Sequence, residues 1–381
     1  WAPIANNLVV IVVFSAFLIK WPSVNVDSIT STQIQILGWG TTAGIIVQAL
    51  ILIPVVKRSG IKIRPKWGVA GLGKSFSLAG WTLVYVLISQ IGYLITVNVA
   101  TTAAVDSAKA GITTGVGFTP FKNAYLIMLL PYSIVTISIV TALLPHMSKL
   151  AINKKIDDVK DQLLRAIKTV GVLTIPSSVA FLLFGPLITE VLFFGISKND
   201  GIYIGYVLSA LSLGLVAFSI NLVLIRGFNA FEDTRTQVGS ILVINLISVA
   251  LSYLFLSTLQ NKWVTVGLGA AFSISYLVGL FVTLALLKRH IGKLALREFA
   301  SQHFRLFLAS FIAMGPLFLI SYYFDWVGAD TSSGMRALEL LIVMVISFIG
   351  FYFTSRLLRI EEISLGKELV ASLMGRNKSV E

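Results

Sequence analysis

Long apolar stretches alternate with short polar segments along the whole chain. Each stretch comes close to or exceeds the roughly 20 residues that a helix needs to cross a bilayer. A backbone in lipid must satisfy its own hydrogen bonds, which a helix does. The pattern therefore predicts an all-α protein, a polytopic membrane bundle with ten transmembrane helices. These lie near residues 3–19, 35–56, 76–100, 121–145, 170–194, 203–225, 238–259, 264–287, 306–324 and 338–358.

The composition supports this prediction and narrows the chemistry. Of the 381 residues, 56% are hydrophobic and only 12% are charged, whereas soluble globular proteins carry about 25% charged residues. Cysteine is absent and the three histidines lack metal-ligand spacing. The 17 acidic residues fall almost entirely between the apolar stretches, and no pair has the spacing of a hydrolase or a metal site. We therefore predict neither enzyme activity, nor a metal site, nor a cofactor.

Lysine and arginine concentrate in alternate polar segments. All but six of the 30 lie in 57–74, 146–169, 226–235, 288–305 or beyond residue 355. The positive-inside rule makes this side cytoplasmic, together with both ends of the chain. The net charge of +13 then reflects membrane topology, and we predict no nucleic-acid partner. The six exceptions are Lys20, Lys109, Lys122, Lys198, Lys262 and Arg336.

Two cytoplasmic segments, 151–168 and 360–374, are amphipathic. Their apolar residues recur at spacings of three or four among charged ones. Such basic amphipathic helices are typical of segments that lie on an anionic membrane surface. The alternative is that they dock partner proteins.

The apolar stretch 123–149, NAYLIMLLPYSIVTISIVTALLPHMSK, is unusual in containing proline and hydroxyl residues. Pro131 removes one backbone hydrogen bond and favours a kink. At about 100° per residue, the side chains of Ser133, Thr136 and Thr141 fall within one arc of a helix. A hydroxyl stripe of this kind indicates a face turned toward protein or a wet cavity. The alternative is that the hydroxyls only join helices by hydrogen bonds.

This stretch and two others resemble the MurJ/MviN family of the multidrug/oligosaccharidyl-lipid/polysaccharide exporter superfamily. The second is the loop RGFNAFEDTRTQ at 226–237, and the third is the start, APIANN, at 2–7. Gln237 stands where the family often has proline. In physical terms, the side chains of Asp233 and Thr234 can cap the helix that follows.

The resemblance implies that the chain corresponds to helices five to fourteen of the family, with the first four missing. Together with a beginning at Trp1, this predicts a fragment of a longer product. The implied divisions are the last two helices of the N-terminal lobe (1–56), a six-helix C-terminal lobe (57–290), a lipid-groove helix pair (291–358) and a cytoplasmic amphipathic tail (359–381).

The family resemblance also implies a function. Its members are flippases that move the lipid-linked peptidoglycan precursor, lipid II, from the inner to the outer leaflet of the bacterial cytoplasmic membrane by alternating access. The expected partners are lipid II or a similar polyprenyl pyrophosphate glycan, membrane lipids, and cell-division or cell-wall synthesis proteins. The alternatives are export of another polyprenyl-linked glycan, or a membrane scaffold that recruits cell-wall synthesis proteins.

An anionic head group needs cationic or N–H donors along its path. Arg226 sits at the predicted cytoplasmic edge of a membrane span, within reach of lipid phosphates, and is a candidate contact of the substrate. The alternative is that Arg226 only extends its charged end to the membrane–water interface beside a capped turn. In the eighth helix the family has Asp-Arg where this chain has Tyr125-Leu126. We expect Lys122, one turn earlier on the same helical face, to supply the charge. The alternative is an ordinary interfacial lysine.

Cation coupling is the last candidate activity. Many relatives carry Asp or Asn in the seventh helix at a place that serves cation binding, and this chain has Thr96 there. Asn98 and Asn245 are polar residues of nearby spans that could contribute. The alternative for all three is interhelical hydrogen bonding. Because carboxylates are missing from the middle of the spans, we expect the membrane potential to contribute to transport.

Overall fold

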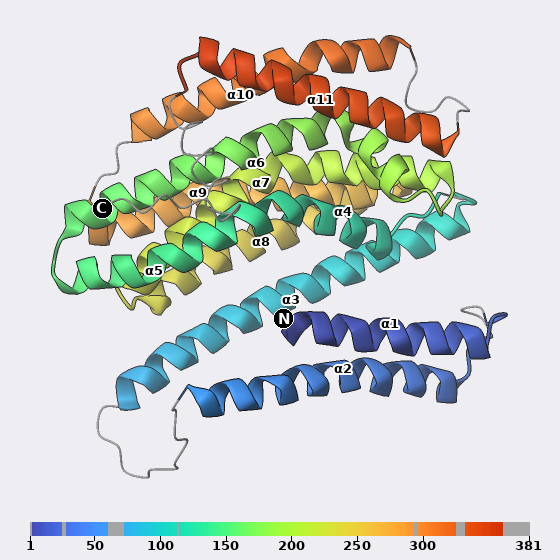
Figure 1. The fold of residues 1–381 in the computed structure, drawn as a ribbon, viewed down its shortest axis with the longest axis horizontal. Coiled ribbons are helices and arrows are strands. Elements are labelled where there is room, and N and C mark those ends of the chain that lie inside the picture. Colours follow the sequence, from blue (N-terminus) through green and yellow to red (C-terminus); the bar gives the residue numbers. More distant parts are fainter. Residues whose placement is uncertain are drawn as a thin grey trace. The chain divides into compact units, whose positions relative to one another are not determined.

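The computed structural model describes residues 2–24, 28–59, 72–112, 114–292, 296–324 and 332–360. Within these residues, helices are joined by short turns and no strand is present, so the all-α prediction is confirmed (Figure 1). In chain order the helices are α1 (Ala2–Lys20), α2 (Ser31–Arg58), α3 (Leu72–Lys109), α4 (Phe118–Pro131), the π-helical turn η1 (Tyr132–Thr136), α5 (Ile137–Ile152), α6 (Ile156–Leu192), α7 (Lys198–Ala230), α8 (Thr234–Thr258), α9 (Asn261–Ile291), α10 (Leu296–Tyr323) and α11 (Ser333–Leu357).

Nine of the helices in the described ranges are individually long and apolar enough to cross a membrane. The predicted span at 121–145 is different, because it is divided among α4, η1 and α5, which follow one another without a break. With 14 and 16 residues, α4 and α5 are each too short to span alone. The π turn begins directly after Pro131, whose missing N–H cannot continue the regular hydrogen-bond ladder.

The chain divides into two compact units, residues 1–72 and 73–381. In the first unit, α1 and α2 pack against each other. Glycines of α2 let the two helices approach closely. A Cβ atom at Gly40 would lie 2.5 Å from Cγ1 of Val13, and one at Gly44 would overlap the side chain of Asn6.

The second unit is built around α7. In the most apolar window of α7, 72% of the residues are buried, against 17–44% for the other candidate spans of this unit. Helices α6 and α9 pack along α7, and α8 packs on α9. Helix α10 lies on α6, and α11 contacts both α10 and α6 (Figure 1). The divisions predicted at residues 57, 291 and 359 stay predictions.

The tightest approach in the second unit is the crossing of α6 and α7. A Cβ atom at Gly185 would lie 2.6 Å from the backbone oxygen of Gly205, and one at Gly205 would overlap the backbone of Pro186. Thr189 Oγ1 also donates a hydrogen bond of 2.7 Å to the backbone oxygen of Gly201. Small residues at this crossing therefore allow the contact that positions α6 on the central helix.

We expect Gly205→Ala to lower the free energy of unfolding by about 1–3 kcal/mol, because the added methyl group forces two backbones apart. Thermal unfolding in detergent measures the loss. Gly315→Ala is the matched control, since a Cβ atom at this helical glycine would meet nothing within 4 Å. Equal melting temperatures for the two variants would contradict the close crossing.

The prediction that residues 151–168 lie with their apolar face on the membrane surface is wrong. Most of this segment is the beginning of α6, which continues through the apolar span. Its apolar face is covered by the protein, because Val159, Leu163 and Ile167 are buried in a cluster with residues of α7 and α9. The amphipathic pattern here belongs to a helix face that packs on protein. Sequence periodicity cannot distinguish such a face from one that contacts lipid. The other such segment, 360–374, lies beyond the described residues except for Ile360.

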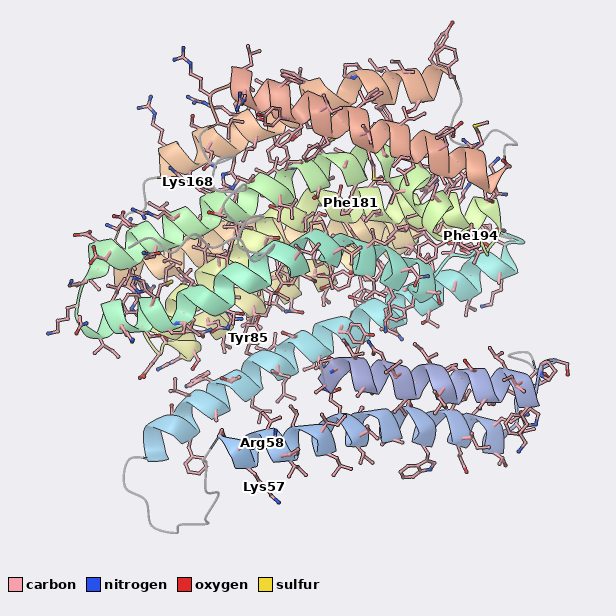
Figure 2. All side chains as sticks on the ribbon, in the orientation of Figure 1. Lys57, Arg58, Tyr85, Lys168, Phe181 and Phe194 are labelled. Atoms are coloured by element: carbon pink, nitrogen blue, oxygen red, sulfur yellow. The ribbon has the colours of Figure 1, made fainter. Side chains whose placement is uncertain are left out.

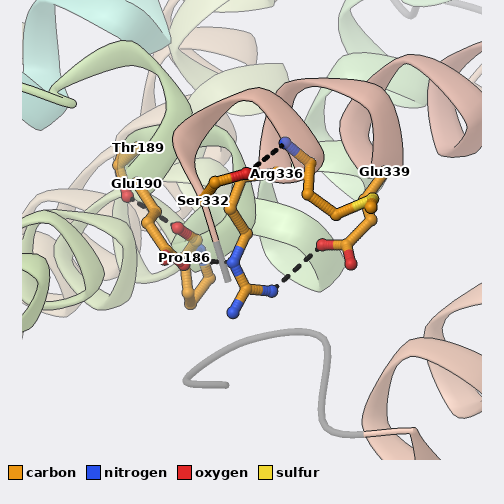
Figure 3. A network of polar contacts seen from close by, with 7 residues as sticks. Pro186, Thr189, Glu190, Ser332, Arg336 and Glu339 are labelled. Carbon is orange, nitrogen blue, oxygen red and sulfur yellow. Dashed lines mark hydrogen bonds and ion pairs between the residues drawn. The ribbon is translucent and has the colours of Figure 1, made fainter. Parts of the chain in front are cut away.

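A buried ion-pair network joins α11 to α6 (Figure 3). The side chain of Arg336 is 2% exposed. Its Nε lies 3.2 Å from Oε1 of Glu190, and its Nη1 lies 3.0 Å from Oε2 of Glu339. Both carboxylates are also largely buried. The network fixes the first turn of α11 to the last turns of α6.

Candidate functional site

The segment formed by α4, η1 and α5 carries the three predicted substrate-contacting hydroxyls. Ser133 and Thr141 are exposed, and their hydroxyls donate hydrogen bonds of 2.7 Å to the backbone oxygens of Leu129 and Ile137. Thr136 is 1% exposed, and its hydroxyl has no hydrogen-bond partner among the described residues. The prediction that the three hydroxyls share one face is therefore wrong, and their contact with substrate stays a prediction.

The π turn explains this separation. A π-helix has more residues per turn than an α-helix, so side chains within and after it point in directions that differ from those of a continuous α-helix. η1 packs on α6 and α7, which bury Thr136. Ser133 and Thr141 remain on an exposed stripe with Lys122, Leu126 and Leu130.

The two predicted cationic residues lie at opposite ends of the second unit. Lys122 is exposed near the start of α4. The backbone N–H of Gly115, just before α4, donates a 2.6 Å hydrogen bond to Oδ1 of Asp200 in the first turn of α7. The starts of α4 and α7 are thus at the same end. Arg226 is near the other end of α7, roughly 40 Å along its axis at 1.5 Å per residue, so Lys122 and Arg226 do not form one site.

The charge of Arg226 is uncompensated within the part of the chain that the structure describes. Its side chain is partly buried, and Nε is buried with no hydrogen-bond partner in the described ranges. The guanidinium lies within electrostatic range of the hydroxyls of Tyr85 on α3 and Tyr132 in η1. Tyr85 is labelled in Figure 2. Among the described residues Arg226 makes no ion pair with a carboxylate, and an anion is the partner that its guanidinium would bind most strongly.

Five aromatic rings pack in sequence, and one of them, Phe218, lies two helical turns before Arg226 on α7. The ring centroids are 5.7 Å apart for Tyr125 and Phe272, and 4.6 Å apart for Phe272 and Tyr276. Those of Tyr276 and Phe218, and of Phe218 and Tyr132, are each 5.0 Å apart. We call these five residues the ring path. It joins α4, η1, α7 and α9, and ends at Tyr132, whose ring contacts that of Phe218. Phe218 lies eight residues before Arg226 on α7, about 12 Å along the helix axis.

Four tyrosine hydroxyls gather in this region. The hydroxyl of Tyr276 is within electrostatic range of those of Tyr85, Tyr125 and Tyr132. Within the described part of the chain, none of the four hydroxyls has a hydrogen-bond partner, whereas Tyr203 outside the group donates a 2.6 Å bond to a backbone oxygen. We call Arg226 and these four tyrosines the Arg–Tyr site.

Sequence reasoning identified Arg226 but missed the tyrosines, noting Tyr125 only as a departure from the family pattern. A signal was present. Tyrosine in membrane proteins is enriched at the two interfaces, whereas Tyr85, Tyr132 and Tyr276 lie well inside predicted spans. Their grouping could not be predicted, because it requires four helical elements to be placed side by side.

Two of the three predicted cation-binding residues come close together. The side chain of Asn245 on α8 lies against Gly92 of α3, one helical turn before Thr96. Thr96 Oγ1 donates a 3.0 Å hydrogen bond to the backbone oxygen of Gly92, and Asn245 Nδ2 donates a 2.9 Å bond to that of Ile241. Asn98 is exposed. Within the described ranges, no group of three His, Cys, Asp or Glu residues could hold a metal ion. Cation binding stays a prediction.

The loop after α7 is fixed by Asp233. It is the N-cap of α8, as predicted, and its Oδ1 accepts a 3.0 Å hydrogen bond from the backbone N–H of Thr236. Its Oδ2 lies 2.7 Å from Nε2 of His290. Burial raises the pKa of the Asp233 carboxyl, but hydrogen bonds from Thr236 and His290 outweigh it, so that this pKa lies below its ordinary value. The Thr234 hydroxyl has no partner among the described residues, and its predicted capping role is wrong.

The sequence matches a family model and several curated proteins. The family model described as "Lipid II flippase MurJ" matches residues 1–345. A probable lipid II flippase MurJ of Rhizobium meliloti is 29% identical over 240 residues, which cover 62% of this chain and 42% of the relative. The lipid II flippase MurJ of Burkholderia cenocepacia is 24% identical over 324 residues, covering 83% of this chain and 60% of the relative. The chain thus spans about half the length of these curated relatives.

Among solved structures, the fold resembles "Lipid II flippase MurJ, inward closed conformation" with a TM-score of 0.61. The sequences are 21% identical, and the match covers 93% of this chain and 67% of the other. At this identity the likeness concerns the fold, which is that of a multi-pass helical membrane protein.

Proposed function

The chain belongs to the MurJ family of lipid II flippases, and we propose that it forms part of a transporter for a lipid-linked peptidoglycan precursor. In this proposal the protein moves the head group of lipid II from the inner to the outer leaflet of the bacterial cytoplasmic membrane. It acts by alternating access and catalyses no covalent step. Its partners are the lipid substrate, the surrounding lipids, and cell-division or cell-wall synthesis proteins.

The observation that carries this proposal is the Arg–Tyr site. A charged side chain within a membrane-spanning bundle is costly unless it is paired. The guanidinium of Arg226 makes no ion pair with the described residues, and the pyrophosphate of a polyprenyl-linked glycan supplies the missing charge. Phosphate oxygens can accept two parallel hydrogen bonds from arginine. The phenol hydroxyls around it can donate further hydrogen bonds to the same group.

The charge pattern of the loops supports an orientation of the chain in the membrane. The positive-inside rule supports a cytoplasmic location for both ends of this chain, and for the loop after α7. Arg226 would then meet the head group as it enters from the inner leaflet. An anionic head group also responds to the membrane potential, which contributes about 2.3 kcal/mol per charge per 100 mV.

Transport itself is tested in proteoliposomes that contain the protein and fluorescent lipid II. We expect lipid II to move between leaflets, and the rate to change when a potential is imposed. No movement of lipid II above empty liposomes, with or without a potential, would refute the proposed function. Movement of a different polyprenyl-linked glycan, with no movement of lipid II, would show that this protein transports another substrate.

Lys122 gives a separate prediction. If it supplies charge to the head group near the outer end of the path, Lys122→Gln slows transport about twofold to fivefold, the loss expected for an exposed charge contact. The change is measured in the same liposome assay. Lys109→Gln is the matched control, because Lys109 lies at the same predicted outer side and pairs with Asp106 at 3.7 Å. Equal rates for Lys122→Gln and wild type would make Lys122 an ordinary interfacial lysine.

A further inference from the structure

The ring path has features of a binding surface. Tyr125, Tyr132, Phe272 and Tyr276 are each only partly buried, while Phe218 beneath them is 7% exposed. Adjacent rings are 4.6 to 5.7 Å apart at their centroids, which is contact distance for aromatic pairs. The result is a continuous, partly exposed aromatic surface that ends about two helical turns from Arg226.

Packing alone does not account for the hydroxyls on this surface. A phenol that is buried usually finds a hydrogen-bond partner for its O–H group, and in lipid an unsatisfied polar group costs several kcal/mol. The hydroxyls of Tyr125, Tyr132 and Tyr276 have no such partner within the described residues, and none of them is among the fully buried oxygens, so they remain accessible to a ligand or to water. The hydroxyls therefore indicate a polar ligand or water on the ring path.

We propose that the ring path is a subsite for a sugar ring, next to an anion subsite at Arg226. This inference rests on the proposed function, which supplies a glycosylated polyprenyl pyrophosphate as ligand. A sugar ring has an apolar C–H face that packs on aromatic rings, and hydroxyl groups that exchange hydrogen bonds with phenols. The first sugar of such a lipid is bonded directly to the pyrophosphate. With the pyrophosphate on Arg226, this sugar would lie on Tyr132 and its neighbours.

The subsite makes the protein selective for glycosylated lipid over the bare carrier lipid. Arg226 binds any polyprenyl pyrophosphate, whereas the ring path adds affinity only when a sugar is attached. A transporter with both subsites would discriminate against the sugar-free pyrophosphate carrier, which has the same charged group. The selectivity therefore depends on the tyrosines rather than on the arginine.

The test compares two probes, undecaprenyl pyrophosphate with and without one N-acetylhexosamine, titrated into the purified protein in detergent. We expect Tyr132→Leu and Tyr276→Leu each to weaken binding of the sugar-bearing lipid about tenfold, the loss expected when an aromatic contact is removed. Binding of the sugar-free lipid should change less than twofold. Tyr206→Leu is the matched control, because Tyr206 is 40% exposed and pairs with Trp263 away from the ring path.

The possible results distinguish failure of the sugar subsite from failure of the proposed function. Equal losses for both lipids, or no loss for either, would overturn the sugar subsite and leave the proposed function standing. Failure of the wild-type protein to bind either lipid would overturn the proposed function as well. If the leucine variants unfold, the double variant Tyr132→Phe, Tyr276→Phe keeps both rings and tests the hydroxyls. A loss of about threefold or more, confined to the sugar-bearing lipid, supports the subsite, and an unchanged affinity refutes it.

Discussion

Under the proposed function we expect Arg226→Gln to slow lipid II transport about 10- to 100-fold, the range for removal of a charge-assisted hydrogen bond of roughly 1.5–3 kcal/mol. Glutamine keeps much of the length and one pair of donors but has no charge. It cannot offset the cost of moving a pyrophosphate into an apolar bundle. Because Arg226 makes no ion pair with the described residues, its loss leaves no protein carboxylate unpaired, and we expect the melting temperature to change little.

Two further variants make this result specific. Arg226→Lys keeps the charge but loses the planar fork that binds two phosphate oxygens, so we expect an intermediate rate. Arg235→Gln removes an exposed arginine of the neighbouring loop, whose guanidinium lies 5.5 Å from the ring centroid of Trp81. Transport by Arg235→Gln should match wild type. Similar rates for the Gln variants at 226 and 235 would show that Arg226 is only another interfacial cation.

The largest effect on stability is expected from Arg336→Met. Removing one partner of a buried ion pair costs about 3–5 kcal/mol, because it leaves the opposite charge uncompensated. Here two carboxylates, Glu190 and Glu339, lose the same partner. The first turn of α11 should then separate from α6. Thermal unfolding in detergent gives the loss, and hydrogen exchange should show increased opening at the start of α11.

The control for Arg336 is Arg356→Met, at the other end of α11. The Arg356 guanidinium lies 5.0 Å from the ring centroid of Tyr352, and among the described residues its removal leaves no buried carboxylate unpaired. We also expect the triple variant Arg336→Met, Glu190→Gln, Glu339→Gln to recover much of the lost stability, since replacing a whole buried network is often nearly neutral. If the single and triple variants are equally destabilised, side-chain packing rather than charge pairing holds α11 in place.

The helices were predictable because apolar length is read directly from the sequence. Every predicted span coincides with a helical segment among the described residues, and the one that differs, 121–145, is divided by a π turn at Pro131. The π turn packs against α6 and α7, and this packing cannot be read from the sequence of residues 121–145. Residues 151–168 were misassigned for a related reason, because an amphipathic pattern gives the width of an apolar face but not what covers it.

The site was predictable only in part. Arg226 was identifiable because an arginine at the edge of an apolar span is conspicuous. The tyrosines were not, since Tyr85 and Tyr276 are separated by most of the second unit in sequence and their relative position depends on how α3 and α9 are placed. The sequence named both Lys122 and Arg226 as contacts of the head group but could not show how far apart they are. The structure places them at opposite ends of the helices, so they do not form one site.

Cryo-electron microscopy of the protein with a polyprenyl-pyrophosphate-linked N-acetylhexosamine would test the central claim most directly. We predict density for the pyrophosphate at the guanidinium of Arg226 and density for the sugar ring on Tyr132 and Tyr276. The account is contradicted if the head group occupies another part of the protein while Arg226 and the tyrosines contact only protein or lipid tails.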